Sequence, residues 1–218
     1  MKKNGKRRLI SGMVLLAIFA IWTWLIQCVD VQPAGPKDTK IGFAAFNCWF
    51  HSVTGVHMAV YTLTGWLGLV PIVVCIAFGG IGLFQLVKRK SLLKVDRDLI
   101  FLGIYYVVVI FGYLVFEMIP VNYRPILIEG ILEASYPSST TLLVLSVMPT
   151  LIFQADRRIA DHTVKRLICV LTAAFSVFMV IGRLIAGVHW FTDIVGAVIL
   201  SAGLYCIYQA AVFIFCDE

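Results

Sequence analysis

The stretch Leu99–Ile119, with the sequence LIFLGIYYVVVIFGYLVFEMI, decides the fold class of this chain. Its 21 residues include a single charged side chain, that of Glu117. About 20 predominantly apolar residues are enough for an α-helix to cross the hydrocarbon core of a bilayer. The stretch is therefore predicted to be a membrane-spanning helix that carries an acidic group close to its C-terminal end.

Five further runs have a similar length and apolar character. They are Leu9–Cys28, Gly65–Val87, Pro137–Ala155, Leu167–Ala186 and Ile194–Cys216. The 218-residue chain is 61% hydrophobic and 14% charged, whereas soluble domains contain about 25% charged residues. We therefore expect an all-α polytopic membrane protein, a bundle of six transmembrane helices in which residues 1–218 form a single membrane-embedded domain.

Two segments beside these runs have a different character. Ile41–Leu63 mixes aromatic residues with His51, His57 and several threonines, which is typical of a helix at the membrane surface. We expect this interfacial helix to lead into the second span. The basic segment Met1–Arg8 precedes an apolar run longer than the about 7–15 residues of a signal peptide, so Leu9–Cys28 is predicted to remain as an anchor.

Basic residues gather on one side of the predicted membrane. Of the 18 lysines and arginines, 14 precede the first span or lie between spans two and three or spans four and five. They are Lys2, Lys3, Lys6, Arg7, Arg8, Lys88, Arg89, Lys90, Lys94, Arg97, Arg157, Arg158, Lys165 and Arg166. The positive-inside rule places this side in the cytoplasm of a protein in the cell membrane, with both termini inside. The net charge of +6 thus follows the membrane and does not indicate a nucleic-acid partner.

The six cysteines do not have the spacing of a metal site. Cys28 and Cys48 lie near the predicted outer face, and their pairing in a disulfide stays open. The other four fall within predicted spans, where packing is their expected role. We expect neither a metal ion nor a cofactor.

Three groups of polar residues share the predicted outer side. They comprise Glu117 with Asn122, Tyr123 and Arg124; Ser135–Thr141 at the start of the fourth span; and Arg183, His189 and Asp193 between the last two spans. An ionisable residue within a membrane costs about 2.5–3.5 kcal/mol on insertion scales, so such residues usually mark a functional site. The three groups therefore predict a site at the outer face.

The chemistry of these groups suits a phosphate. Arg124 and Arg183 present planar sets of donors to phosphate oxygens. A helix that begins after Pro137 offers free N–H groups and the positive end of its dipole. His189 can attack phosphorus, while Asp193, four residues further on and thus one helical turn away, fixes the imidazole tautomer. These residues predict phosphoryl chemistry on a lipid at the membrane surface.

Structural roles remain possible for each residue taken singly. Serines and threonines at a helix start commonly act only as caps. Arg124 can be a solvated or headgroup-bound charge, and His189 can be an interfacial residue. Glu117 can be a structural partner of Arg124 or a proton-relay carboxyl. Structural polar groups have no reason to converge on one face, so the convergence favours a functional site.

Residues 117–197 resemble the type 2 phosphatidic acid phosphatase family, relatives of the vanadium haloperoxidases. That family has three motifs, K-x-x-x-x-x-x-R-P, P-S-G-H and S-R-x-x-x-x-x-H-x-x-x-D. The matching residues are Arg124, Pro125, Pro137, Ser138, Arg183, His189 and Asp193. The resemblance implies that His189 is a nucleophile that forms a phosphohistidine, oriented by Asp193, without a metal ion. The implied substrate-binding residues are Arg124, Arg183, Ser138 and Ser139.

The chain departs from these motifs at several positions, and the second motif reads Pro137-Ser138-Ser139-Thr140. Glu117 stands where the first motif has lysine, and Gly182 replaces the serine of the third. Thr140 replaces the histidine of the second motif, which would protonate the leaving group. Threonine cannot act as an acid near neutral pH, and general acid catalysis contributes about 10²–10⁴-fold.

Three alternatives follow from the missing histidine. The substrate can be a diphosphate, whose phosphate leaving group needs little protonation. Another acid can substitute, with Glu117 ahead of His57 and Tyr136. Catalysis can also be lost. We expect a lipid-phosphate phosphatase-like protein that acts on a phosphatidate-type lipid or a polyprenyl diphosphate at the outer face. The alternative is a catalytically impaired relative that binds or transports a phosphorylated lipid.

Overall fold

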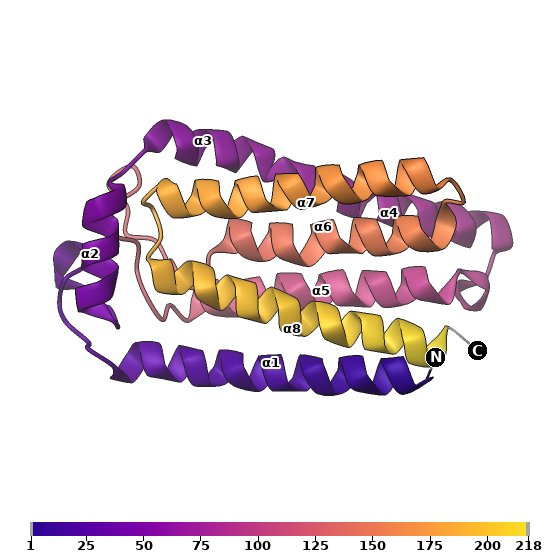
Figure 1. The fold of residues 1–218 in the computed structure, drawn as a ribbon, viewed down its shortest axis with the longest axis horizontal. Helices are drawn as coiled ribbons and strands as arrows, with labels where there is room; N and C mark the ends of the chain where they lie inside the picture. The colour runs from indigo at the N-terminus through magenta and orange to yellow at the C-terminus, as the bar shows by residue number, and fades with distance from the viewer. Residues whose placement is uncertain (1, 217–218) are drawn as a thin grey trace.

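The computed structural model describes residues 2–216, which form eight α-helices, two single-turn 3-10 helices and no β-strand (Figure 1). The α-helices are α1 (Lys2–Cys28), α2 (Ala44–Thr54), α3 (Met58–Leu67), α4 (Leu69–Arg89), α5 (Arg97–Met118), α6 (Ser139–Arg158), α7 (His162–Ile185) and α8 (Phe191–Phe215). The 3-10 helices are η1 (Pro36–Asp38) and η2 (Leu92–Lys94). The prediction of an all-α fold is confirmed.

Six of the described segments are long and apolar enough to cross a membrane. They are α1, the joined pair α3–α4, α5, α6, α7 and α8. Their mean hydropathies lie between 1.2 and 2.5, and the least apolar of them, α6, is also the most buried. The polar residues of α6 therefore face other helices, and the prediction of six transmembrane helices is confirmed.

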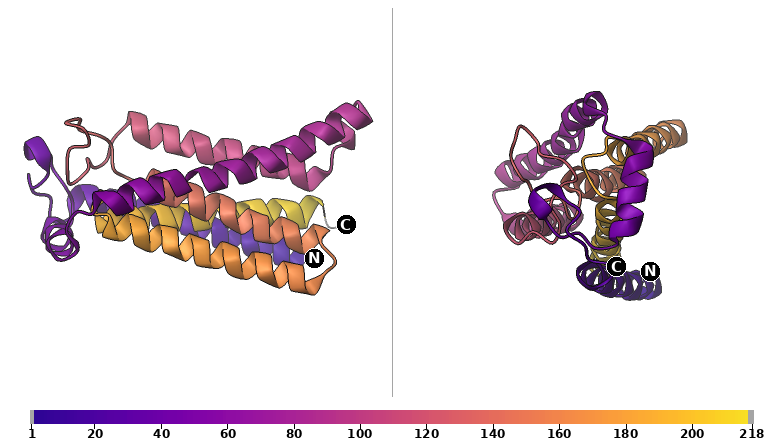
Figure 2. Two further views of the ribbon diagram at one scale, coloured as in Figure 1. Left: turned by 90° about the horizontal axis from the view of Figure 1, so that it is seen from above. Right: turned by 90° about the vertical axis from the view of Figure 1, so that its left-hand side faces the viewer.

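The segment expected to be one interfacial helix is divided. Helix α2 lies across one end of the bundle, as an interfacial helix would (Figure 1). A bend at residues 55–57 then starts α3, which continues through Gly68 into α4 as one arm of 32 residues. Figure 2 shows this arm running obliquely along the bundle. Residues 58–63 thus belong to the second span because α3 packs against α7, a tertiary contact that hydropathy does not report.

Helix α8 occupies the centre of the bundle. It packs along α1 on one side and against α5 and α6 on others (Figures 1 and 2). Its buried residues join two separate apolar clusters, one around Leu200 and one around Tyr208 and Val212. The first turn of α8, which carries Asp193, is therefore held on a rigid element.

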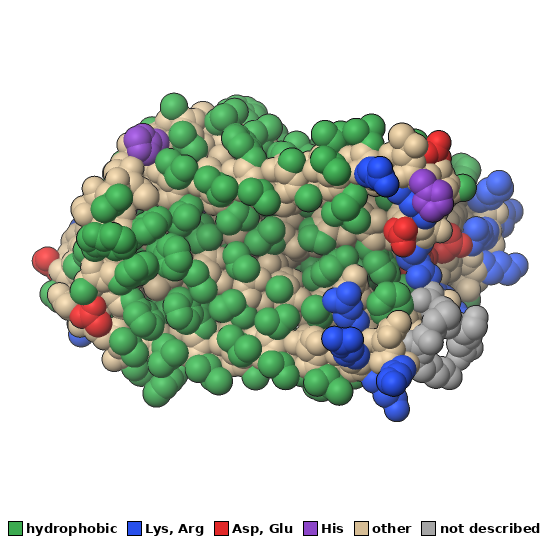
Figure 3. Space-filling model, in the orientation of Figure 1, with side chains coloured by type: hydrophobic (Ala, Val, Ile, Leu, Met, Phe, Trp, Pro, Cys, Tyr) green, Lys and Arg blue, Asp and Glu red, His purple; other side chains and the backbone are tan. Residues whose placement is uncertain are grey.

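Charged residues divide the two ends of the molecule. Figure 3 shows most lysines and arginines at the end where both termini lie, with an apolar belt along the middle. At that end Asp98, on α5, is buried and pairs with Arg158 at 2.7 Å and Arg157 at 3.6 Å, both on α6. The opposite end carries α2 and the loops that contain the polar groups identified in the sequence.

The loop between α5 and α6 folds back on itself at that opposite end. The Arg124 amide donates to the Glu133 carbonyl at 3.1 Å, and the Ser135 amide donates to the Asn122 carbonyl at 2.9 Å. Backbone pairing of this kind fixes the positions of four polar side chains at once. Cys28 and Cys48, whose pairing the sequence left open, are both free thiols in the structure.

Candidate active site

His189 lies in the turn between α7 and α8 and is almost fully buried. Its Nδ1 lies 3.1 Å from the carbonyl oxygen of Ser135 and 3.1 Å from the hydroxyl of the same residue. A carbonyl oxygen can only accept a hydrogen bond, so Nδ1 carries the proton of the neutral ring. The lone pair is then on Nε2, which is the nitrogen available for attack on phosphorus.

Asp193 is connected to His189 through the hydroxyl of Ser135. The distance from His189 Nδ1 to Asp193 Oδ2 is 4.0 Å, which is too long for a hydrogen bond. The Ser135 hydroxyl instead donates to Asp193 Oδ2 at 2.5 Å and accepts from the imidazole. The sequence prediction of one helical turn between the two residues is wrong, because α8 begins only at Phe191.

Two further donors fix the carboxylate of Asp193, which is fully buried. Asn122 donates from Nδ2 to Oδ1 at 3.2 Å, and the Trp190 amide donates to Oδ2 at 2.9 Å. The second bond caps the start of α8. Three donors thus hold the carboxylate in place, and it is available to balance positive charge on the imidazole.

Two guanidinium groups face the other nitrogen of the imidazole. Nη1 of Arg124 lies 3.4 Å from His189 Nε2, and Nη2 of Arg183 lies 3.3 Å from it. Burial, together with the positive charges of Arg124 and Arg183, lowers the pKa of His189 well below its usual range. The ring is therefore neutral at pH 7, the protonation state that a nucleophile requires.

Helix α3 positions Arg183. The guanidinium lies 4.8 Å from the centre of the Tyr61 ring, and Nη1 lies 3.4 Å from the Thr64 hydroxyl. Its Nε is buried and has no hydrogen-bond partner among the described residues. A buried donor without a partner is costly, so this N–H suits an oxygen of a ligand.

Glu133 positions Arg124. Its Oε2 lies 2.9 Å from Arg124 Nε, an ion pair whose geometry is not that of an aligned hydrogen bond. The sequence had left Glu117 as a possible structural partner of Arg124, and this role belongs to Glu133. Arg124 also lies 6.0 Å from the centre of the Tyr61 ring, so one aromatic ring contacts both guanidinium groups.

Two glycines allow the close approaches that build the site. A Cβ at Gly182 would lie 2.7 Å from Cγ2 of Thr64, so glycine is what lets α3 pack against α7 beside Arg183. Gly187 has a φ of 67° and packs directly on the backbone of Gly55. The His57 amide donates to the Ala186 carbonyl at 3.1 Å across the same contact. The turn that carries His189 is thereby fixed to the α2–α3 connection.

Two adjoining cavities open beside the arginines. The first, of about 430 Å³, is lined by Arg124, Arg183 and Tyr61. The second, of about 520 Å³, runs between α4, α5 and α6 and is lined mainly by apolar side chains. Gly65, Leu69, Ser139 and Thr140 line both cavities. A charged compartment therefore adjoins an apolar one of a size typical for ligands.

The start of α6 brings its polar residues to different places. Ser139 and Thr140 line the two cavities, whereas Ser138 is fully buried and its hydroxyl donates to Thr141 at 3.1 Å. The Ser138 amide donates to the Asp193 carbonyl at 3.2 Å. Ser138 therefore supports the turn that holds Asp193. The first turn of α6 still offers N–H groups that lack partners within the helix.

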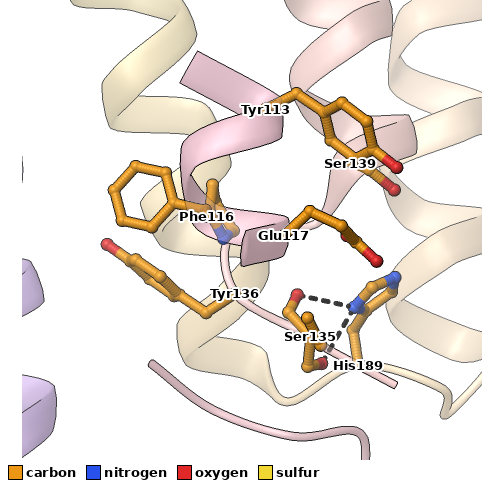
Figure 4. Close-up of a pocket in the computed structure, with 9 residues that line it drawn as sticks. Tyr113, Phe116, Glu117, Ser135, Tyr136, Ser139 and His189 are labelled. Carbon is orange, nitrogen blue, oxygen red and sulfur yellow. Dashed lines mark hydrogen bonds between the residues drawn. The ribbon is translucent and has the colours of Figure 1, made fainter. Parts of the chain in front are cut away.

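Glu117 lies at the end of α5, close to His189. Both residues border a third, small cavity together with Tyr113, Ser135 and Ser139 (Figure 4). Figure 4 shows the Glu117 carboxylate directed towards the imidazole. The structure thus brings together the predicted residues Glu117, Arg124, Ser139, Thr140, Arg183, His189 and Asp193.

Sequence reasoning missed the roles of several residues that shape the site. Ser135 and Asn122 were within the predicted polar groups, but their bonds to Asp193 depend on the fold of the loop. Tyr61, Thr64 and Glu133 carried no sequence signal, because each acts through a contact with an arginine far away in the chain. Within residues 2–216, no three His, Cys, Asp or Glu side chains are grouped so that they could hold a metal ion.

Comparisons with known proteins agree with this arrangement. A family model described as the PAP2 superfamily matches residues 96–214, which contain all three motifs. A similar solved structure is described as the crystal structure of the first transmembrane PAP2 type phosphatidylglycerolphosphate phosphatase from Bacillus subtilis. The two chains are 17% identical, the match covers 95% of this chain and 98% of the other, and the TM-score is 0.59. At this identity the match establishes a shared fold. No curated protein matches the chain.

Proposed function

Because the chain belongs to the PAP2 superfamily, we propose that it is a membrane phosphatase that hydrolyses a phosphorylated lipid through a phosphohistidine on His189. The observation that carries the proposal is the environment of Nε2. This nitrogen bears the lone pair of a neutral imidazole and faces Arg124 at 3.4 Å and Arg183 at 3.3 Å. A phosphoryl group on Nε2 would place its oxygens among the guanidinium donors.

The proposed reaction has two steps. His189 Nε2 attacks phosphorus, the bond from phosphorus to the leaving oxygen breaks, and a phosphohistidine forms. Water then attacks phosphorus, the P–N bond breaks and inorganic phosphate leaves. Arg124 and Arg183 stabilise the charge on the phosphoryl oxygens in both steps. Asp193, through Ser135, stabilises the positive charge that develops on the imidazole.

The adjoining cavities support a lipid as the substrate. The cavity that contains the arginines suits an anionic headgroup, and the apolar cavity between α4, α5 and α6 suits a hydrocarbon chain. Their shared wall at Ser139 and Thr140 would place the scissile bond at the boundary between them. Soluble phosphate esters would leave the apolar cavity without an apolar occupant.

Thr140 favours a substrate with a good leaving group. It lines the compartment where the family motif has an acidic histidine, and its hydroxyl cannot supply a proton near pH 7. A diphosphate expels a phosphate, which is stable without protonation, whereas a monoester expels an alkoxide. We therefore rank lipid diphosphates above lipid monophosphates such as phosphatidylglycerolphosphate, which the similar Bacillus subtilis protein is named for.

The proposal places the site at the outer face of the cell membrane. Basic residues gather at the end of the bundle that holds both termini (Figure 3), and the connection between α7 and α8, which contains His189, lies at the other end (Figure 1). The positive-inside rule assigns the basic end to the cytoplasm. Labelling of intact cells with a membrane-impermeant amine reagent tests this orientation, because Lys37 should react while lysines of the α4–α5 loop should not. The reverse pattern would contradict it.

The activity test uses the purified full chain in detergent micelles with farnesyl diphosphate, phosphatidate and phosphatidylglycerolphosphate. We expect phosphate release, loss of that release in His189→Ala, and retention in His162→Ala, a histidine at the other end of α7. Release that persists in His189→Ala would refute the nucleophile. If no lipid is hydrolysed but farnesyl diphosphate raises the melting temperature, the alternative of a binding protein holds. The observation that favours this alternative is Thr140, which stands where the family motif has an acidic histidine.

A further inference from the structure

Resting on the proposed phosphohistidine, we propose that Glu117 is the catalytic base that activates the water which hydrolyses this intermediate. The family motif has a lysine at this position, so the role belongs to this chain's own residues. The inference depends on a small cavity, on the pairing of the neighbouring carboxylates and on the chemistry of the second step.

The cavity beside His189 has the size of one water molecule. Its volume of about 10 Å³ is close to the smallest space that holds a water. Glu117, His189 and Ser139 contribute polar side chains to its wall, together with Tyr113 and Ser135. Figure 4 shows the Glu117 carboxylate between the imidazole on one side and the hydroxyls of Tyr113 and Ser139 on the other. A water there has the two to four polar partners that an ordered water requires.

Of the carboxylates of Glu117, Glu133 and Asp193, that of Glu117 is available to accept a proton from water. Glu133 is paired with Arg124 at 2.9 Å. Asp193 accepts hydrogen bonds from Ser135, Asn122 and Trp190, so its oxygens are occupied. Within residues 2–216, Glu117 makes no hydrogen bond and no ion pair. Its side chain can therefore accept a proton without breaking an existing contact.

Hydrolysis of the phosphohistidine needs a base other than His189. In the phosphohistidine, Nε2 of His189 is bonded to phosphorus and cannot accept a proton. Glu117 takes a proton from water while the water oxygen bonds to phosphorus. The P–N bond breaks, its electron pair returns to Nε2, and phosphate is released. Glu117 then passes its proton to solvent, and the exposed position of this residue allows that transfer.

The exchange of lysine for glutamate is consistent with this role. A lysine is protonated near neutral pH and would bind phosphate, but it could not accept a proton from water. Compared with a lysine, a carboxylate at this position does not attract phosphate but can act as a base. Arg124 and Arg183, at 3.4 Å and 3.3 Å from Nε2, remain to bind the phosphoryl oxygens.

Trapping of the intermediate tests the proposal. The full chain in micelles is mixed with a lipid substrate that is radiolabelled in its terminal phosphate. The substrate is farnesyl diphosphate or phosphatidylglycerolphosphate, whichever the wild type hydrolyses faster. In Glu117→Gln we expect a burst of the dephosphorylated lipid, label that accumulates on His189, and phosphate release slowed by about 10²–10⁴-fold. Glu117→Asp should restore part of the rate. A role in structure alone would not cause label to accumulate.

Two matched variants serve as controls. Glu129→Gln removes an exposed carboxylate from the loop that follows α5 and should behave as wild type. Glu133→Gln removes the partner of Arg124 and should slow formation of the phosphohistidine without trapping it. Equal melting temperatures of Glu117→Gln and wild type would show that the variant is folded.

Two results would overturn the role of Glu117. One is phosphate release at the wild-type rate in Glu117→Gln. The other is slowed turnover without accumulated label, which would move Glu117 to the first step. Failure of the proposed function looks different, because the wild type itself would then release no phosphate or His189→Ala would remain active; that result removes both proposals.

Discussion

Nδ1 of His189 and Oδ2 of Asp193 lie 4.0 Å apart, and the hydroxyl of Ser135 joins them. The serine accepts from the imidazole and donates to the carboxylate, so the imidazole is connected to the charge of Asp193 through the Ser135 hydroxyl. A serine hydroxyl can rotate and exchange its donor and acceptor roles. An ionised carboxylate, by contrast, can only accept a hydrogen bond. The Ser135 carbonyl, also 3.1 Å from Nδ1, adds an acceptor that does not rotate.

The link from Asp193 through Ser135 to His189 predicts graded losses of activity. Asp193→Asn should lower kcat by up to about 10⁴-fold, because it removes the buried negative charge that balances positive charge on the imidazole of His189. Ser135→Ala should lower it less, by about 10–100-fold, because the Ser135 carbonyl still orients Nδ1. In the double variant the losses should not add, since both residues act through His189. Additive losses in single-turnover rates would contradict the serine link.

Introducing the family's serine at position 182 should destabilise the protein. In Gly182→Ser the new Cβ would lie 2.7 Å from Cγ2 of Thr64, and overpacking of this kind costs about 1–3 kcal/mol. We expect a lower melting temperature and a higher KM, because α3 holds Arg183. Thr64→Ser removes only the clashing methyl group and keeps the hydroxyl bonded to Arg183. The double variant should therefore recover stability; no recovery would show that the defect arises elsewhere.

The environment of His189 predicts a pH profile. Burial and the charges of Arg124 and Arg183 lower the pKa of His189, so the neutral imidazole persists below about pH 6.5, where an ordinary histidine becomes protonated. The acidic limb of kcat/KM should lie below pH 6.5. Because the substrate also titrates near pH 6, an NMR titration of histidine-labelled protein, with His189→Ala for assignment, provides the independent measurement. A midpoint at 6.5 would contradict the prediction.

Thr140 predicts a difference between substrate classes. Thr140→His should restore an acid in the compartment that Arg124 and Arg183 line, and should raise hydrolysis of phosphatidate by about 10²-fold or more. Hydrolysis of farnesyl diphosphate should change little, because its leaving group needs no proton. The ratio of the two kcat/KM values is the measurement. An equal gain for both lipids would contradict the leaving-group argument.

The spans could be predicted from the sequence because hydropathy is a local property. Leu99–Ile119 and the helix observed at Arg97–Met118 differ by one or two residues at each end. The polar residues of the site were also found, because charge is rare in these apolar runs. The second span was the exception: its first residues belong to α3, whose place is set by contact with α7.

The mutual arrangement of the site residues could not be predicted. His189 and Asp193 are four residues apart, which suggests a helical turn, but the helix starts between them at Phe191. The sequence suggested only Glu117 as a partner for Arg124, whereas the folded loop pairs Arg124 with Glu133. Such choices depend on loop geometry and on packing between distant helices, which a single sequence does not encode in its local pattern.

The ring of Tyr61 keeps two like charges side by side, with Arg183 at 4.8 Å and Arg124 at 6.0 Å from its centre. The two guanidinium groups repel each other, and an anion between them offsets that repulsion. Occupation by phosphate should therefore tighten the docking of α3 on α7 as well as fill the headgroup compartment. Phosphate binding and folding are then thermodynamically linked, so the melting temperature of this protein should rise with the phosphate concentration around it.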